Sequence, residues 1–98
     1  MPIAKLTFEI EIAHAQSLKD RRQVVRSLKD KVRHSFNASI AEMDDGTIWN
    51  RATLALVAIS NSNSYLTGQM QQIDDAVHRI VVGLGAEVLD SFSEIIAE

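Results

Sequence analysis

The chain begins with a strict alternation of apolar and polar positions over residues 3–13. This spacing is typical of a strand with one buried face. The buried face would hold Leu6, Phe8, Ile10 and Ile12. Residues 38–43 and 86–97 also predict strands. On the last of these, one face would hold Val88, Phe92 and Ile96.

Residues 52–60 form an apolar run with apolar side chains on both faces, which predicts a central strand covered on both sides. The preceding Asp44-Asp45-Gly46 tripeptide has the residue types of a tight turn. With only two helices in the chain, the second face of this strand needs another cover. A second copy of the protein is the simplest candidate.

Apolar residues at helical spacing predict two helices. The first begins near Leu18, because Ser17 and Asp20 have the spacing of a capping box, and ends near Phe36. The second follows residues 61–64, which are rich in capping side chains, and ends at Gly83 or Gly85.

The order strand, helix, strand, strand, helix, strand predicts an α+β, ferredoxin-like βαββαβ fold. Right-handed crossovers would place both helices on one face of a four-stranded antiparallel sheet. The other face would carry Thr7, Glu9 and Glu11 from the first strand. The 98 residues suit a single ferredoxin-like domain over residues 1–98.

Composition adds a soluble, globular character, with 46% hydrophobic and 23% charged residues. The chain has no cysteine, so it has no disulfide or thiolate metal site, and this composition fits a reducing compartment. The longest apolar run, Leu54–Ile59, is far shorter than a bilayer span. We therefore expect a cytoplasmic protein without a membrane segment.

Charge is unevenly distributed over this acidic chain, whose net charge is −3. Seven of the ten Lys and Arg residues lie between Lys19 and Arg33, where only two carboxylates accompany them. Five of the seven are spaced three or four residues apart and form one stripe along the first helix. These candidate RNA-binding residues are Lys19, Arg22, Arg26, Lys29 and Arg33. A flank of solvated charges that merely covers the core edge is the alternative interpretation.

Arg21 differs from this stripe because it lies on the apolar face of the first helix. We expect its side chain to extend over the edge of the core, and a buried carboxylate partner is the alternative. Trp49 and Arg51 lie close enough in sequence for a small anion site, although a packed loop is the simpler expectation.

No pattern of catalytic residues emerges from the sequence. His14, His34 and His78 lack metal-ligand spacing, and Gly83-Leu84-Gly85 lacks the third glycine of a dinucleotide motif. The carboxylates Glu42, Asp44 and Asp45 lack the spacing of a calcium loop and fit a solvated turn. We therefore expect no enzyme, no metal and no cofactor.

Several segments together resemble the YlxP-like family of small bacterial proteins of unknown function. The resemblance rests on residues 17–22, 36–42, 49–54 and 60–61 and covers nearly the whole chain. Asp20 and Arg21 stand where Glu and Lys are common in that family. The resemblance implies a ferredoxin-like fold and a cytoplasmic bacterial protein whose genes often neighbour those for translation initiation and ribosome maturation factors. It supplies no active site.

The sequence leads to two functional hypotheses. In the first, the protein is a non-enzymatic binding module, expected to be a homodimer, whose basic stripe contacts ribosomal or other structured RNA without DNA specificity. In the second, it is a homo-oligomeric protein–protein interaction module whose working surface is the open sheet face.

Overall fold

The computed structural model describes residues 1–96 and contains six elements in the predicted order. They are β1 (Ile3–Glu11), α1 (Leu18–Ser35), β2 (Ser39–Glu42), β3 (Arg51–Ile59), α2 (Asn63–Gly83) and β4 (Glu87–Ile96). The predicted bounds differ from these by one or two residues. Residue 97, included in the predicted last strand, lies outside the described residues.

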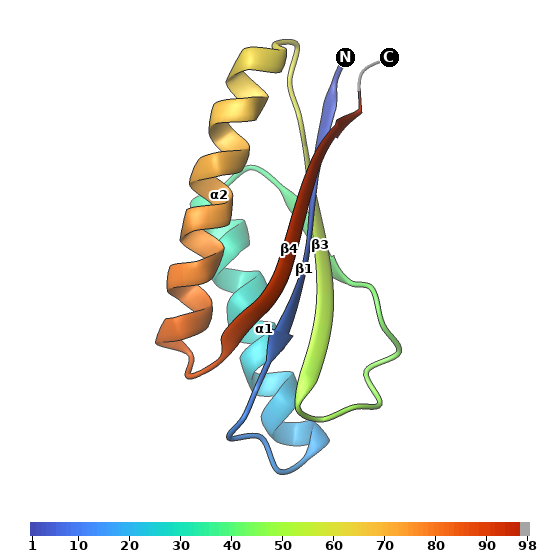
Figure 1. Ribbon diagram of the computed structural model, residues 1–98, viewed down its shortest axis with the longest axis vertical. Helices are drawn as coiled ribbons and strands as arrows, with labels where there is room; N and C mark the ends of the chain where they lie inside the picture. Colours follow the sequence, from blue (N-terminus) through green and yellow to red (C-terminus); the bar gives the residue numbers. More distant parts are fainter. Residues whose placement is uncertain (97–98) are drawn as a thin grey trace.

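The four strands form one antiparallel sheet in the order β2-β3-β1-β4. Both helices cover the same face of this sheet (Figure 1). This arrangement is the ferredoxin-like fold, so the predicted fold class is confirmed. The short β2 and the long β4 are the two edge strands.

Local capping explains where the helices begin and end. Ser17 accepts a hydrogen bond from the Asp20 backbone N–H at 3.2 Å, as the capping box requires. The Asp20 carboxylate returns to the backbone N–H of Gln16, one residue before the expected partner. After α2, Gly85 adopts a φ of +79°, a left-handed conformation that glycine enters without steric cost.

The core lies between the sheet and the helices, because alternate strand positions and one helix face are apolar. Its largest fully buried side chains come from β1, from β3 and from both helices. They include Phe8, Leu6, Ile10, Leu28, Leu54, Leu56, Leu66 and Ile73. The burial of alternate residues along β1 confirms its predicted inward face.

The second face of β3 is not covered by any element of the described chain. Val57 and Ile59 are 40% and 61% exposed there, although β3 is a central strand. The predicted central position of this strand is therefore confirmed, while its outer apolar side chains remain open to solvent.

The prediction that Val88, Phe92 and Ile96 share one face of β4 is wrong. A register shift opposite Glu9 and Ile10 pairs Val88 with Ile10, on the core side, and Phe92 with Thr7, on the open side. Val88 packs against the core, whereas Phe92 and Ile96 are 62% and 49% exposed. A β-bulge inserts one residue and so reverses the facing of every residue beyond it.

Candidate functional site

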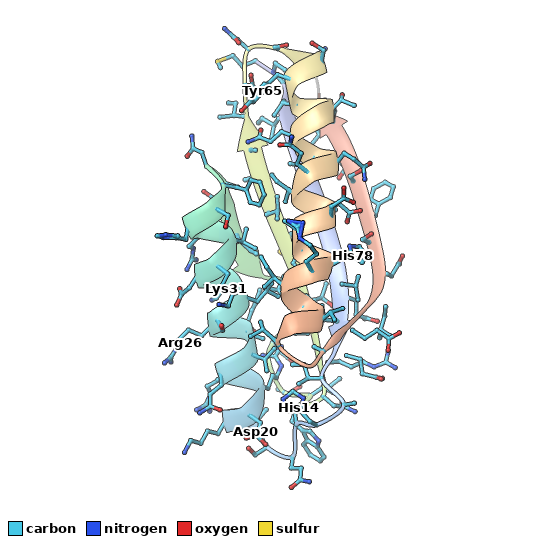
Figure 2. All side chains as sticks on the ribbon, turned by 90° about the vertical axis from the view of Figure 1, so that its left-hand side faces the viewer. His14, Asp20, Arg26, Lys31, Tyr65 and His78 are labelled. Carbon is cyan, nitrogen blue, oxygen red and sulfur yellow. The ribbon has the colours of Figure 1, made fainter. Side chains whose placement is uncertain are left out.

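The basic stripe runs along the outer edge of α1, on the flank that faces β2 rather than α2. Figure 2 shows Arg26 projecting from this edge, away from α2. Lys19, Arg22, Arg26 and Arg33 are exposed, and Lys29 is partly exposed. The structure thus brings all five predicted residues to one continuous strip of surface, as the three-and-four spacing predicts.

Within residues 1–96, four of these five cations form no ion pair. Arg33 is the exception, because its Nη1 lies 4.0 Å from Oδ1 of Asp30 and its Nη2 donates to the carbonyl of Ile40 at 3.1 Å. The second bond ties the last turn of α1 to β2. The remaining four charges are available to an anion from solution.

Two of the arginines outside the stripe are paired. Arg51, on the open sheet face, lies 3.4 Å from Glu9 Oε1 and 3.6 Å from Glu11 Oε2. Arg21, inside the first turn of α1, lies 2.8 Å from a carboxylate oxygen of Glu42 and 2.8 Å from one of Asp44. Charge pairing therefore separates the exposed stripe from these two arginines.

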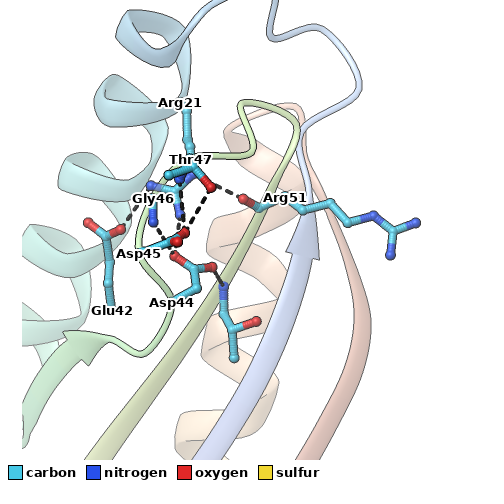
Figure 3. A network of polar contacts seen from close by, with 8 residues as sticks. Arg21, Glu42, Asp44, Asp45, Gly46, Thr47 and Arg51 are labelled. Atoms are coloured by element: carbon cyan, nitrogen blue, oxygen red, sulfur yellow. Dashed lines mark hydrogen bonds and ion pairs between the residues drawn. The ribbon is translucent and has the colours of Figure 1, made fainter.

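Arg21 is 3% exposed, and every arm of its guanidinium has an acceptor. Nη1 donates to Glu42, Nη2 donates to Asp44, and Nε donates to the backbone carbonyl of Arg51 at 3.0 Å (Figure 3). These partners come from the end of β2, the following loop and the start of β3. Arg21 thus joins α1 to both ends of the connection between these strands.

Asp44 is the centre of the loop that Arg21 holds. Its Oδ1 also accepts from the Gly46 N–H at 3.0 Å, and its Oδ2 accepts from the Thr53 N–H at 2.8 Å. Gly46 adopts a φ of +72°, and a Cβ placed there would lie 3.4 Å from Arg21 Nη1. The positive φ favours glycine here, because other side chains enter this backbone conformation at a steric cost.

The next residue, Asp45, is fully exposed and makes a separate local turn. Its Oδ1 accepts from the Thr47 hydroxyl at 2.9 Å and from the Thr47 N–H at 3.3 Å. These bonds, the hydroxyl bond first, hold the pKa of the Asp45 carboxyl below its ordinary value because they stabilise the ionised form.

The expectation that Arg21 extends over the core edge is wrong, and its buried-carboxylate alternative is confirmed. Sequence reasoning assigned Glu42 and Asp44 to a solvated turn, whereas both accept from Arg21. The clue in the sequence was a charged residue at a core-facing helix position, since such a charge needs a partner. The sequence offered several carboxylates and no means of choosing between them.

Trp49 and the histidines contribute no shared site in the described residues. Trp49 is 52% exposed. His14 lies at the end of the molecule near the start of α1, and His78 lies midway along α2, where its Nδ1 is 2.8 Å from the carbonyl of Asp74 (Figure 2). Residues 1–96 bring together no group of three or more His, Asp or Glu side chains able to hold a metal. Over the same residues, neither helix is long and apolar enough to cross a membrane.

Comparison with known proteins identifies the family. Residues 3–91 match the family described as protein of unknown function, DUF503, and the chain belongs to it. The chain is also similar to the uncharacterized protein YlxP of Bacillus subtilis, with 31% identity over 65 residues that cover 66% of this chain and 71% of that protein. The resemblance to a YlxP-like family is thereby confirmed.

Three solved structures share the fold at low identity. A dimeric ferredoxin-like protein of unknown function from Thermobifida fusca has a TM-score of 0.54 and 14% identity, covering 100% of this chain and 92% of that one. The YXEP protein of Bacillus subtilis, a dinuclear metal-binding peptidase of the M20 family, has a TM-score of 0.60 and 9% identity over 96% of this chain.

A C-terminal segment of the alpha subunit of aIF2 from Pyrococcus abyssi has a TM-score of 0.51 and 10% identity over 100% of this chain. This chain spans 52% of the Pyrococcus chain and 25% of the peptidase. At these identities the three likenesses establish the architecture alone.

Proposed function

We propose that this DUF503 protein is a non-enzymatic RNA-binding module that uses the basic stripe of α1 to contact the phosphate backbone of structured RNA. The observation that supports the proposal is the row of cations without ion pairs along one flank of α1. Arg21 and Arg51 are held by carboxylates, whereas four of the five stripe cations form no ion pair among the described residues.

The charge distribution adds a second argument. Between residues 18 and 35 seven cations face two carboxylates, and elsewhere three cations face eleven. An acidic protein with one basic edge presents that edge to a polyanion, because the rest of its surface repels the same partner. The stripe therefore orients the protein as well as attracting the RNA.

The open sheet face is unsuited to RNA. An RNA-recognition motif stacks bases on aromatic side chains of its central strands. The central strands here place Glu9 and Glu11 on that face, and these carboxylates would repel phosphates. The proposed contact is consequently made by helix side chains to the backbone, without readout of base edges.

Small ribosomal subunits are the first RNA to test, because the family resemblance implies genes beside those of translation factors. Five phosphate contacts to single-stranded RNA would give a log–log salt slope of about −3 to −4. We expect the binding constant for the subunits, measured by co-sedimentation, to fall with that slope across a salt series.

A pair of charge-reversal variants isolates the stripe. The double variant Arg22→Glu, Arg26→Glu changes two exposed side chains for which the structure shows no hydrogen bond or ion pair in residues 1–96. Its matched control is Lys31→Glu, Arg79→Glu, which alters exposed cations outside the stripe and shifts the net charge equally. We expect the stripe variant to lose RNA binding and the control to keep it.

Equal loss in both variants would show that only net charge matters, and binding retained in both would show that the stripe is a solvated flank. Either result would overturn the proposal. Circular dichroism and thermal unfolding of all three proteins would establish that the differences arise from the surface.

A further inference from the structure

The open face of the sheet can be described as rows of side chains that cross the strands. Residues paired in the antiparallel register lie side by side, and alternate positions point away from the helices. The middle row runs from Ala41 through Ala55 and Thr7 to Phe92, in the strand order β2, β3, β1, β4.

This middle row has a hollow at one end and a protruding side chain at the other. Ala41 and Ala55 form the small floor of a hollow of about 320 Å³, which Met43, Val57 and Lys5 border. At the β4 end, Phe92 is 62% exposed, although it is one of the largest apolar side chains in the chain. An apolar hollow and an exposed ring thus occupy opposite ends of one row.

Two further rows cross the sheet near the ends of the strands, one of them apolar and the other charged. One row joins Ile59, Ile3 and Ile96, with Ile59 and Ile96 61% and 49% exposed. The other joins Arg51 on β3, Glu11 on β1 and Glu87 on β4. In that row the cation lies near one edge and a carboxylate lies at the other.

We propose that the open face binds a second copy of this chain, face to face, about a two-fold axis that runs parallel to the strands and passes beside β1. Neighbouring strands lie about 4.8 Å apart, so such an axis places β4 of one copy opposite the space between β2 and β3 of the other. Phe92 then enters the hollow above Ala41 and Ala55 of its partner, and the symmetry makes this contact twice.

The same axis satisfies the two outer rows. It sets Ile59 opposite the partner's Ile96, so apolar side chains cover one another. It sets Arg51 opposite the partner's Glu87, so a cation of one copy faces a carboxylate of the other. An axis perpendicular to the strands would instead stack Phe92 on the partner's Phe92 and leave both hollows empty.

The size of the face sets the strength of this dimer. Three strands of nine or ten residues and the four-residue β2, at about 3.3 Å per residue and about 4.8 Å between strands, give a face of roughly 500 Å² and roughly 1,000 Å² buried over two copies. Stable interfaces begin near 1,200 Å², so we expect a weak dimer whose population depends on protein concentration.

Sedimentation equilibrium from low micromolar to submillimolar protein tests this assembly. We expect the wild type to pass from monomer to dimer and Phe92→Asp to weaken the dimer by at least about 30-fold, because it places a charge in an apolar hollow. Val82→Asp is the matched control, since Val82 is 69% exposed on α2, away from the sheet face, and should leave dimerisation unchanged. A wild type that stays monomeric over this range overturns the proposal.

Exchanging the two side chains of a proposed contact, in each of two contacts, tests the position of the two-fold axis. Arg51→Glu and Glu87→Arg should each weaken the dimer, and the double variant should restore it. Ala41→Phe should block the hollow, and adding Phe92→Ala should recover dimerisation by moving the ring to the opposite side of the contact. Additive losses in both double variants would contradict the proposed axis.

Cross-linking separates this axis from any other face-to-face dimer, because the chain has no native cysteine. Thr53 and Asp90 lie in one row, on β3 and β4, and the proposed axis sets each close to the other residue of the partner. A short bismaleimide should join Thr53→Cys chains to Asp90→Cys chains in a mixture and should not join Asp90→Cys chains to one another, because the axis separates those two positions by about 12 Å across the strands. Self-linking of Asp90→Cys alone would contradict the proposed axis.

Discussion

Arg21 and Arg22 are neighbours in sequence and lie in opposite environments. Arg21 is buried and bonded to Glu42, Asp44 and the backbone of Arg51, whereas Arg22 is exposed and forms no ion pair within residues 1–96. One residue turns the side chain by about 100° around the helix, from the core side to the outer flank. The comparison shows that direction on α1, and not residue type, separates a structural arginine from a candidate binding arginine.

Removal of Arg21 should have the largest effect on stability. Arg21→Ala leaves the Glu42 and Asp44 carboxylates without their cation, and loss of one partner of a buried pair costs about 3–5 kcal/mol. Because these carboxylates are about one-third exposed, water compensates part of that cost, and we expect the free energy of unfolding to fall by about 2–4 kcal/mol.

Urea unfolding of Arg21→Ala beside Arg22→Ala measures this difference directly. The second variant should stay within about 0.5 kcal/mol of the wild type, as is usual for surface substitutions. Equal effects of the two substitutions would show that the Arg21 cluster contributes little to the fold.

Asp44→Asn should produce the next largest effect. Asp44 accepts from Arg21, from Gly46 and from Thr53, and an amide presents only one oxygen to these donors. An unmatched polar group at such a position costs about 1–3 kcal/mol. Glu42→Gln, which loses charge at a residue with one bond to Arg21, should cost less in the same unfolding assay, and the reverse order would exclude Asp44 as the centre of the loop.

The stripe should be nearly neutral for folding. Arg22→Glu with Arg26→Glu removes like charges from neighbouring turns, so we expect the free energy of unfolding to change by no more than about 0.5 kcal/mol. Guanidinium or thermal unfolding checks this value. A loss of several kcal/mol would mean that the stripe supports the fold, and the contrast with Arg21 would disappear.

The smallest expected effect concerns Asp45, beside the Arg21 cluster but fully exposed. Thr47→Val removes the hydroxyl bond and should raise the pKa of Asp45 toward its ordinary value. A pKa that is depressed in the folded state stabilises the fold above the unfolded pKa, and this stabilisation disappears as the pH falls through the folded pKa. NMR titration of the carboxyl carbon measures the shift, with Thr47→Ser retaining the low pKa. An unchanged pKa in Thr47→Val would assign the depression to another group.

RNA binding by the basic stripe and dimerisation through the sheet face can be tested separately, because the two surfaces lie on different sides of the molecule. The basic stripe borders the helical layer, and Phe92 with its hollow lies on the opposite face of the sheet. Charge reversal at the stripe should leave dimerisation intact. Substitution of Phe92 should likewise leave the stripe exposed and able to bind RNA as a monomer.

The sequence by itself determined the elements, their order and the basic stripe. Alternation over β1 and helical spacing over α1 are local patterns that reflect burial of one face, and right-handed crossovers leave few topologies for this order. The position of Arg22 and its relatives on one flank follows from helix geometry alone.

Only the tertiary structure decided which distant residues meet. The partners of Arg21 lie 21 to 30 residues away, and pairing of β2 with β3 brings them to the first turn of α1. The bulge in β4 reversed the facing of Phe92. The sequence does not reveal this bulge, because an inserted residue leaves the hydrophobic pattern of a two-sided apolar strand almost unchanged. Contacts between strands depend on register, and register is a property of the assembled sheet.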